Sequence, residues 1–197
     1  MTKYLGTPDF AHGRRARIGV LVCNLGTPDA PTTSAVRRYL AEFLSDPRVI
    51  ETPRAIWWPI LHGLILNVRP RRSAHAYAKI WGAEGSPLLS LSRGLTTQLA
   101  REFAEDADDG IAVALGMRYG SPSIASALDE LIARDARRIV VLPLYPQYAA
   151  ATTGSTFDAL FSALQRTRWV PGLRTVESYH DEPGYIARSE ERRVGKE

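Results

Sequence analysis

Short apolar runs alternate with amphipathic stretches along the chain, and polar turns rich in glycine and proline separate them. Four apolar runs predict buried strands, at 18–25, 111–117, 138–144 and 173–179. Apolar residues at helical spacing predict helices at 35–44, 55–67, 73–81, 88–104, 123–133 and 153–167, with Ser34 capping the first. Because strand, turn and helix recur in this order, we expect an α/β fold with a parallel four-stranded sheet and helices on both faces.

One predicted helix is more apolar than an ordinary surface helix. Residues 55–67 contain two tryptophans and a series of leucine and isoleucine residues, and the arginine-rich segment 69–72 follows them. Two interpretations fit this composition. The helix could lie in a core, or it could form a lip over an apolar cleft.

Polar and aromatic side chains follow three of the predicted strands at the point where each strand ends. The three strand ends are 24–27, 117–120 and 145–148. Ligands of open parallel sheets bind outside the carboxyl ends of the strands, so these groups would meet a ligand at one edge. Each segment alone is also typical of a turn. Together they supply an arginine, hydroxyls, an amide and aromatic faces, which suits a flat, partly polar organic ligand.

Composition and charge exclude several classes of protein. The 197 residues, 45% of them hydrophobic, can form one core. No apolar run reaches the roughly 18 residues of a membrane span, and no signal-peptide pattern is present, so we expect a cytoplasmic protein. The 25 basic and 21 acidic residues are interspersed, which disfavours a nucleic-acid partner. The single cysteine, Cys23, lies in a predicted strand, so we expect a core residue.

Seven segments, in order, resemble the N-terminal part of the ferrochelatases. They are VCNLGTPDAP (22–31), YLAEFLSDPRV (39–49), RPRRSA (69–74), AYAKIW (76–81), EGSPL (84–88), MRYGSP (117–122) and LPLYPQYAAATTGS (142–155). The resemblance extends over about residues 18–187. Such a collinear series makes chance similarity an unsatisfactory explanation.

The resemblance implies a Rossmann-like, chelatase-type domain. Proteins of this family have two similar halves with the porphyrin between them, and they insert ferrous iron into protoporphyrin IX to give protoheme. We expect that the second half is missing here, so that the chain is C-terminally truncated and inactive alone. Two alternatives stay open: a tetrapyrrole-binding half-domain without metal insertion, and a chelatase for another metal or for coproporphyrin.

The resemblance also implies a set of porphyrin-binding residues. Matched position by position, they are Leu25, Arg69, Arg72, Tyr77, Ser86, Arg118, Tyr119 and Tyr145. Leu25 would lie beside the macrocycle near the metal path, where the family also uses methionine or tyrosine. Arg118 and Tyr119 would project into the cleft, and Tyr145 would pack at the ring. The remaining residues would belong to the mobile wall of the porphyrin cleft, on the side that binds the propionate groups. They are Arg69, Arg72, Tyr77 and Ser86.

Catalytic residues cannot be carried over from the family, because its metal-side histidine and glutamate lie in the missing half. His180 precedes the position of that histidine motif, so we interpret it as a solvated residue. We expect no bound cofactor and no metal site, with ferrous iron as a substrate. Some relatives carry an Fe–S cluster, but Ala150 stands where they have a cysteine.

Domain boundaries follow from the same comparison. We expect an N-terminal arm at 1–17, a chelatase domain at 18–187 with an apolar lip at 53–81, and an atypical tail at 188–197. The tail has one apolar side chain in ten residues, so we expect it to be non-native. The lip could also touch a membrane surface. The sequence does not indicate an oligomeric state.

Overall fold

Four parallel strands form one sheet, as predicted from the apolar runs. The computed structural model describes residues 4, 6, 13–106 and 110–194. The strands are β1 (Arg17–Gly26), β2 (Ala112–Tyr119), β3 (Ala136–Pro143) and β4 (Gly172–Thr175). Their order across the sheet is β2-β1-β3-β4. The helices are α1 (Thr33–Leu44), α2 (Arg54–Ile60), α3 (Leu66–Ile80), α4 (Pro87–Asp106), α5 (Ile124–Ala133), α6 (Ser155–Leu164) and α7 (Pro183–Val194). Two wide π-helical turns are η1 (Leu61–Ile65) and η2 (Ala150–Gly154).

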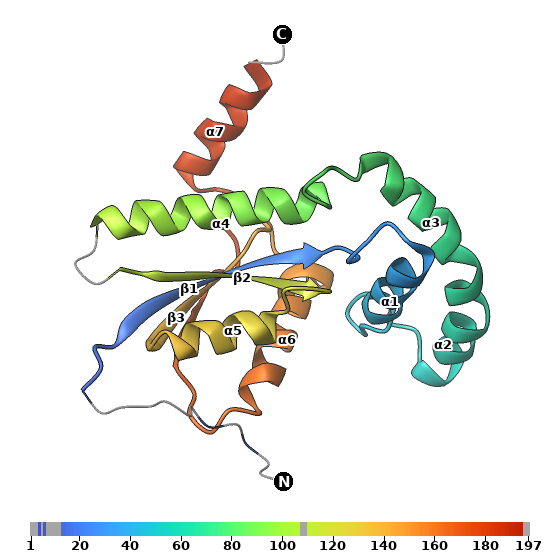
Figure 1. Cartoon of the computed structure of the whole chain (residues 1–197), viewed down its shortest axis with the longest axis horizontal. Coiled ribbons are helices and arrows are strands. Elements are labelled where there is room, and N and C mark those ends of the chain that lie inside the picture. The colour runs from blue at the N-terminus through green and yellow to red at the C-terminus, as the bar shows by residue number, and fades with distance from the viewer. Residues whose placement is uncertain (1–3, 5, 7–12, 107–109, 195–197) are drawn as a thin grey trace.

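Helices cover both faces of the sheet (Figure 1). The helix α4 packs on one face, against Val20 of β1 and Val113 of β2, and α5 and α6 pack on the other. The connection from β1 leads to β2, and the next connection returns past β1 to β3. The direction of winding therefore reverses at the boundary between β1 and β3. In sheets of this kind a ligand binds beyond that boundary, outside the carboxyl ends of the strands.

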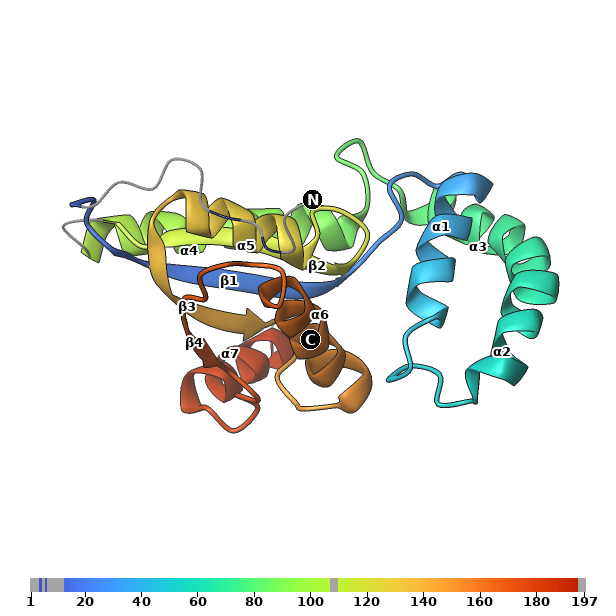
Figure 2. The same ribbon diagram turned by 90° about the horizontal axis from the view of Figure 1, so that it is seen from below.

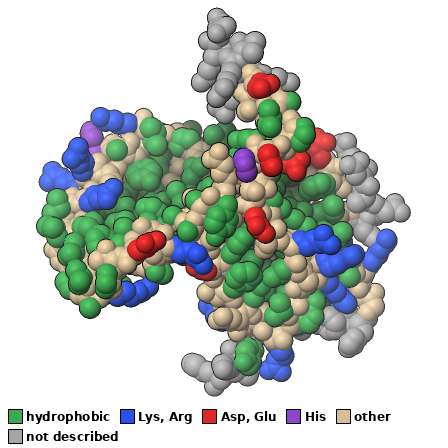
Figure 3. All heavy atoms as spheres, turned by 180° about the vertical axis from the view of Figure 1, so that it is seen from behind, with side chains coloured by type: hydrophobic (Ala, Val, Ile, Leu, Met, Phe, Trp, Pro, Cys, Tyr) green, Lys and Arg blue, Asp and Glu red, His purple; other side chains and the backbone are tan. Residues whose placement is uncertain are grey.

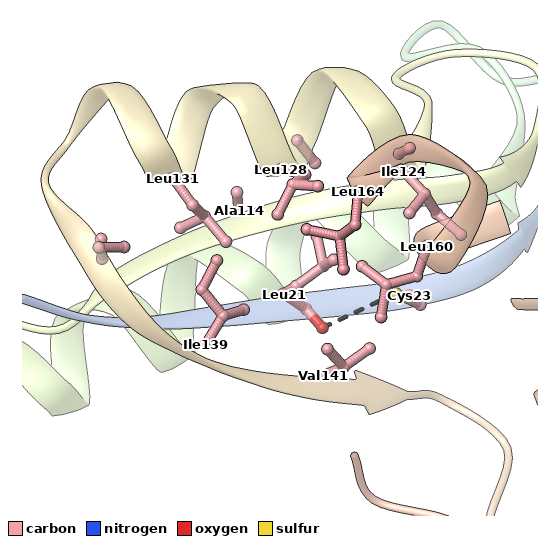
Figure 4. Close-up of a cluster of buried hydrophobic side chains, with 14 residues drawn as sticks. Leu21, Cys23, Ala114, Ile124, Leu128, Leu131, Ile139, Val141, Leu160 and Leu164 are labelled. Carbon is pink, nitrogen blue, oxygen red and sulfur yellow. Dashed lines mark hydrogen bonds between the residues drawn. The ribbon is translucent and has the colours of Figure 1, made fainter. Parts of the chain in front are cut away.

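The larger buried cluster lies between the sheet and helices α5 and α6 (Figure 4). Leu128 and Leu131 of α5 and Leu160 of α6 are fully buried with Leu21 of β1 and Ile139 of β3. Helices cover both faces of β1 and β2, so apolar residues occur there in continuous runs rather than in alternation. This arrangement explains why the strands could be found as unbroken apolar segments.

Cys23 lies in this cluster, and its thiol approaches the carbonyl oxygen of Leu21 at 3.7 Å. The side chain is fully buried, and burial raises the pKa of the thiol well above its usual range. Since modification requires an accessible thiolate, an aromatic disulfide reagent should leave the native chain unlabelled. The same reagent should label one thiol per chain in guanidinium chloride. Equally fast labelling under native conditions would contradict the burial of Cys23.

The structure departs from the predicted helices between residues 55 and 81 and at the start of α1. The predicted helices at 55–67 and 73–81 are not separated, because α3 continues through Pro70. Proline donates no backbone hydrogen bond, but Pro70 is buried and α3 packs along α1, which outweighs the loss of one bond. The cap of α1 is Thr32 rather than Ser34, since the Thr32 hydroxyl accepts the Ala35 N–H at 3.3 Å.

Helices α1, α2 and α3 stand beyond the carboxyl ends of the strands, apart from the sheet (Figures 1 and 2). They share a buried cluster that includes Val36 and Leu40 of α1, Leu61 of η1 and Leu66 of α3. Tyr119, the last residue of β2, belongs to the same cluster and joins these helices to the sheet. Residues 53–81 are called the lip below.

Candidate functional site

The three predicted strand ends meet at one edge of the sheet. The strand β1 pairs in parallel with β2 on one side and β3 on the other, so Gly26 lies beside Tyr119. Beyond β3, the Leu144 N–H donates to the Cys23 carbonyl oxygen at 2.7 Å. This bond holds the segment leading to Tyr145 next to the end of β1. The side chains that follow the three strands therefore share one neighbourhood.

Crowding of the backbone at this edge requires glycine at two positions. Gly26 has φ of +103°, and a Cβ atom there would lie 1.8 Å from the Tyr119 carbonyl oxygen. Gly120 has φ of +81°, and its Cβ atom would lie 2.7 Å from the Thr27 carbonyl oxygen. Only glycine tolerates both the conformation and the close approach. The two glycines thus allow the paired ends of β1 and β2 to approach each other closely.

Asp46, which follows α1, is the centre of a buried hydrogen-bond network at the end of β2. Its Oδ2 atom accepts hydrogen bonds from Arg118 Nη2, from the Ser155 hydroxyl and, at 2.8 Å, from the Tyr119 hydroxyl. Its Oδ1 atom accepts the Arg48 backbone N–H at 2.8 Å. Arg118 Nε donates to the Ser155 hydroxyl at 2.6 Å, which closes the network. One carboxylate therefore connects the segment after α1, the end of β2 and the start of α6.

The electrostatics of this network favour a charged Asp46. Burial by itself would raise the pKa of its carboxyl group, and the side chain is only 2% exposed. Hydrogen bonds from Ser155, the Arg48 backbone and Tyr119, together with the charge of Arg118, outweigh burial and lower the pKa. Burial raises the pKa of Tyr119 to about 12, so its hydroxyl stays protonated and donates at neutral pH.

Tyr145 is the aromatic residue beyond β3, and its hydroxyl is buried without a hydrogen-bond partner among the described residues. Burial is the main cause that raises its pKa, with Cys23 and Tyr119 adding to the effect and Arg118 opposing it. A buried hydroxyl without a partner is costly, so this group is available to a ligand or a water molecule.

Tyr77 of α3 contacts Tyr39, and Tyr39 contacts Tyr119 at the end of β2. The Tyr77 ring packs edge-on against Tyr39 of α1, and Tyr39 packs edge-on against Tyr119, with 6.4 Å between the ring centroids in each pair. The Tyr39 hydroxyl donates to the Gly26 carbonyl oxygen at 3.3 Å. Tyr77 is thus connected to the site by ring contacts.

The lip presents apolar side chains to solvent. Hydrophobic side chains gather over it in Figure 3, with basic side chains along its outer margin. The exposed members include Ile56, Trp58, Ile60, Leu64 and Val68, of which Val68 is 67% exposed. Arg69 and Arg72 are exposed on α3 and make no hydrogen bond or ion pair with other described residues. An apolar surface of this kind marks a binding face rather than an ordinary helix surface.

Ser86 lies in the turn that joins the lip to α4 and is 4% exposed. It borders a cavity of about 290 Å³ together with Thr27, Trp81 and Arg93. The Thr27 hydroxyl is buried and has no hydrogen-bond partner among the described residues. This cavity lies beside the ends of β1 and β2 and is small compared with a porphyrin.

The eight predicted site residues fall into three groups. Leu25, Arg118, Tyr119 and Tyr145 lie at the strand ends, Tyr77 joins them through Tyr39, and the other three lie on the lip or its turn to α4. Tyr119 does not project into an open cleft as predicted from the sequence. It is fully buried, because its hydroxyl is bound by Asp46 and its ring packs among α1 and α3.

Asp46 and Ser155 are the residues of the site that sequence reasoning missed. Neither residue is among the porphyrin-binding residues that the resemblance implies. Both lie in segments that resemble the family, at 39–49 and 142–155, which is the one signal that could have pointed to them.

Two further observations concern the described residues as a whole. Nowhere among them do three or more His, Cys, Asp or Glu side chains gather in a way that could hold a metal ion. His180 is exposed in the loop before α7. Of the helices in the described ranges, none is both long and apolar enough to cross a membrane.

Comparison with known proteins identifies the family. Residues 17–193 match the family model described as Ferrochelatase. The chain is 56% identical over 184 residues to the ferrochelatase of Thioalkalivibrio sulfidiphilus, 54% over 188 to that of Teredinibacter turnerae and 55% over 184 to that of Methylibium petroleiphilum. Each alignment covers 93% of this chain and 50% of the relative, so the chain spans about half the length of the curated relatives it matches.

The matched region extends from β1 into α7 and includes the three strand ends, the lip and the Asp46 network. The resemblance seen in the seven sequence segments is thereby confirmed. The chain belongs to the ferrochelatase family.

Proposed function

We propose that this chain forms one wall of a tetrapyrrole cleft used to insert ferrous iron into protoporphyrin IX, which yields protoheme. The observation that carries the proposal is the meeting of three strand ends, with Arg118 and Tyr145, beside an exposed apolar lip. A porphyrin is apolar across its faces and anionic at its propionate edge, so its site needs both kinds of surface. Membership of the ferrochelatase family supports the same function.

The proposed site residues divide by the part of the ring they would contact. Leu25 and Tyr145 supply apolar surface and ring contact for the macrocycle. Arg69 and Arg72 are exposed on α3, and a guanidinium group suits a propionate because it can donate two parallel hydrogen bonds. Arg118, whose side chain is 18% exposed, supplies a positive charge at the strand ends.

Metal insertion has physical requirements that such a wall can meet in part. The ring must leave planarity so that pyrrole nitrogens turn outward, two protons must leave, and a partly dehydrated ferrous ion must enter from one face. A wall that fits the distorted ring better than the flat ring lowers the barrier, because only binding that strengthens in the transition state accelerates the reaction. We propose that proton removal and iron delivery use groups outside the described residues.

The proposal is tested by comparing the chain with a hybrid protein. The hybrid joins residues 1–187 to the part of the Thioalkalivibrio sulfidiphilus ferrochelatase that the alignment leaves uncovered. Fluorescence titration measures protoporphyrin IX binding, and Soret absorption follows metallation by Fe²⁺ under anaerobic conditions or by Zn²⁺. We expect the chain to bind the porphyrin without metallating it and the hybrid to metallate it.

The other outcomes distinguish the alternatives. Failure of both proteins to bind the porphyrin would refute the proposed function. Binding by the hybrid without metallation would favour a tetrapyrrole-binding role, and preference for coproporphyrin would change the substrate. Turnover by the chain alone would show that these 197 residues carry the whole chemistry.

The proposal places the protein in the cytoplasm, with porphyrin and ferrous iron as substrates and no nucleic-acid partner. The exposed aliphatic side chains of the lip could serve a membrane surface as well as a ring. If one surface serves both, phospholipid vesicles added to the titration will compete with the porphyrin.

A further inference from the structure

Asp46 stands apart from the other carboxylates described because it is buried and accepts four hydrogen bonds. Its side chain is 2% exposed, so water contributes almost nothing to its solvation. A buried charge is stable only when it is paired and hydrogen-bonded. The partners come from β2 and α6 as well as from the backbone after α1, so the carboxylate fixes three segments relative to one another.

Arg118 is the residue most restricted by this arrangement. Its Nη2 and Nε atoms donate to Asp46 and Ser155, and the guanidinium carbon lies 4.4 Å from the centroid of the Tyr119 ring. An unrestrained arginine loses much rotamer freedom when it binds a ligand. Here that freedom is already lost, and Nη1 is the nitrogen without a bond to another described residue.

We propose that Asp46 is a positioning residue, whose buried carboxylate holds Arg118 so that one edge of its guanidinium group faces the tetrapyrrole. The inference rests on the proposed function and adds a residue that does not itself contact the ring. It also assigns the Ser155 hydroxyl, which donates to Asp46 and accepts from Arg118 Nε, as the bridge that sets the angle of the guanidinium plane.

The position of Asp46 in the chain connects this role to the lip. Asp46 lies between α1 and α2, so the buried carboxylate anchors the segment from which the lip begins. A second contact runs from Arg48 to Asp158 of α6, but both side chains are substantially exposed. Exposed ion pairs contribute little, so the anchor depends on Asp46 rather than on Asp158. Asp46 and Asp158 both lie where the segment after α1 contacts α6. Asp158→Asn is therefore the matched control for Asp46→Asn.

The test uses the 197-residue chain and makes two separate measurements. One is the restriction of the Arg118 side chain by its hydrogen bonds, and the other is the affinity for protoporphyrin IX. In ¹⁵N spectra, the Arg118 Nε–H signal, assigned by its loss in Arg118→Lys, should be sharp and slow to exchange with water. Asp46→Asn should broaden it or accelerate its exchange, and should weaken porphyrin binding by about tenfold. Asp158→Asn should change neither quantity by more than about twofold.

Ser155→Ala is the milder variant, in case Asp46→Asn does not fold. It should release Arg118 Nε while leaving Arg118 Nη2 paired with Asp46, so the exchange of the Nε–H should accelerate with a smaller fall in melting temperature than in Asp46→Asn. An unaltered Arg118 signal in both variants would overturn the inference. So would porphyrin binding that is unaffected after Arg118 has been released.

The outcomes also separate this inference from the proposed function. If the unsubstituted chain and the hybrid do not bind protoporphyrin IX, the proposed function fails. The Arg118 signal then still decides whether Asp46 orients the arginine. If the porphyrin binds and the signal does not respond to Asp46→Asn, the function stands and the positioning role fails.

Discussion

Replacement of Gly26 by alanine is expected to lower the melting temperature of the chain by about 10 °C or more, the largest effect of any substitution considered for the fold. A Cβ atom at this position would lie 1.8 Å from the Tyr119 carbonyl oxygen, and the residue has φ of +103°. The conformation alone costs about 1–3 kcal/mol for a residue other than glycine. Relief of the clash requires the paired ends of β1 and β2 to separate, which raises the total to about 3–5 kcal/mol.

The same substitution should also disturb the site, because the clashing atom belongs to Tyr119. Movement of the Tyr119 backbone would displace the hydroxyl that donates to Asp46. Loss of porphyrin binding should therefore accompany the loss of stability. Circular dichroism melting and fluorescence titration on the same preparation measure the two effects.

Gly94 provides the matched control. It lies inside α4, its φ is not positive, and a Cβ atom there meets nothing within 4 Å. Gly94→Ala should leave the melting temperature unchanged or raise it, because alanine is favoured over glycine in a helix by about 0.5–1 kcal/mol. A Gly26→Ala chain that melts like the Gly94→Ala chain would contradict the close approach of the two strand ends.

The strands β1 and β2 could be predicted from the sequence because burial on both faces leaves an uninterrupted apolar run. In β3 one face is buried and the other half-buried, and its run is apolar as well. The run at 18–25 differs from β1 by one residue at each end, and those at 111–117 and 138–144 agree with β2 and β3 within two residues. The fourth strand was predicted too long. It ends at Thr175, and the Tyr179 N–H donates to the Pro146 carbonyl oxygen outside the sheet. That bond is made by the loop beyond β3, which local sequence could not indicate.

Within the site, a residue could be predicted when the signal lay in its own segment, and could not be predicted when its role depends on partners far along the chain. Leu25, Arg118 and Tyr145 could be found because each follows an apolar run at a strand end. The role of Asp46 could not be predicted, since its side-chain partners lie 72 to 109 residues later. Buried polar networks depend on tertiary contacts that no local pattern reports. For the same reason Tyr119 was placed in a cleft, although its hydroxyl is bound by Asp46.

The pH dependence of stability should reveal the Asp46 network. At pH 7, Asp46→Asn should destabilise the chain by about 3 kcal/mol, since Arg118 then keeps its charge in a mostly buried position without its partner. Because the pKa of Asp46 in the folded chain is lowered from its ordinary value of 3.8, the native state favours the charged form. The contribution is therefore fully present above about pH 5, begins to fall near the ordinary value of 3.8, and is lost as pH falls through the lowered value.

The measurement is the difference in unfolding free energy between the unsubstituted and Asp46→Asn chains, from urea titrations between pH 7 and pH 2.5. The difference should be constant down to about pH 5 and should narrow below pH 4. The ionisable groups facing Asp46 are Arg118 and Tyr119 of β2, with Arg48 on its own segment paired to Asp158 of α6. Tyr119, whose pKa is raised to about 12, stays protonated over this range of pH. Asp158 is the same in both chains, so its contribution largely cancels in the difference. A difference that persists unchanged at pH 2.5 would mean that the charge of Asp46 does not stabilise the fold.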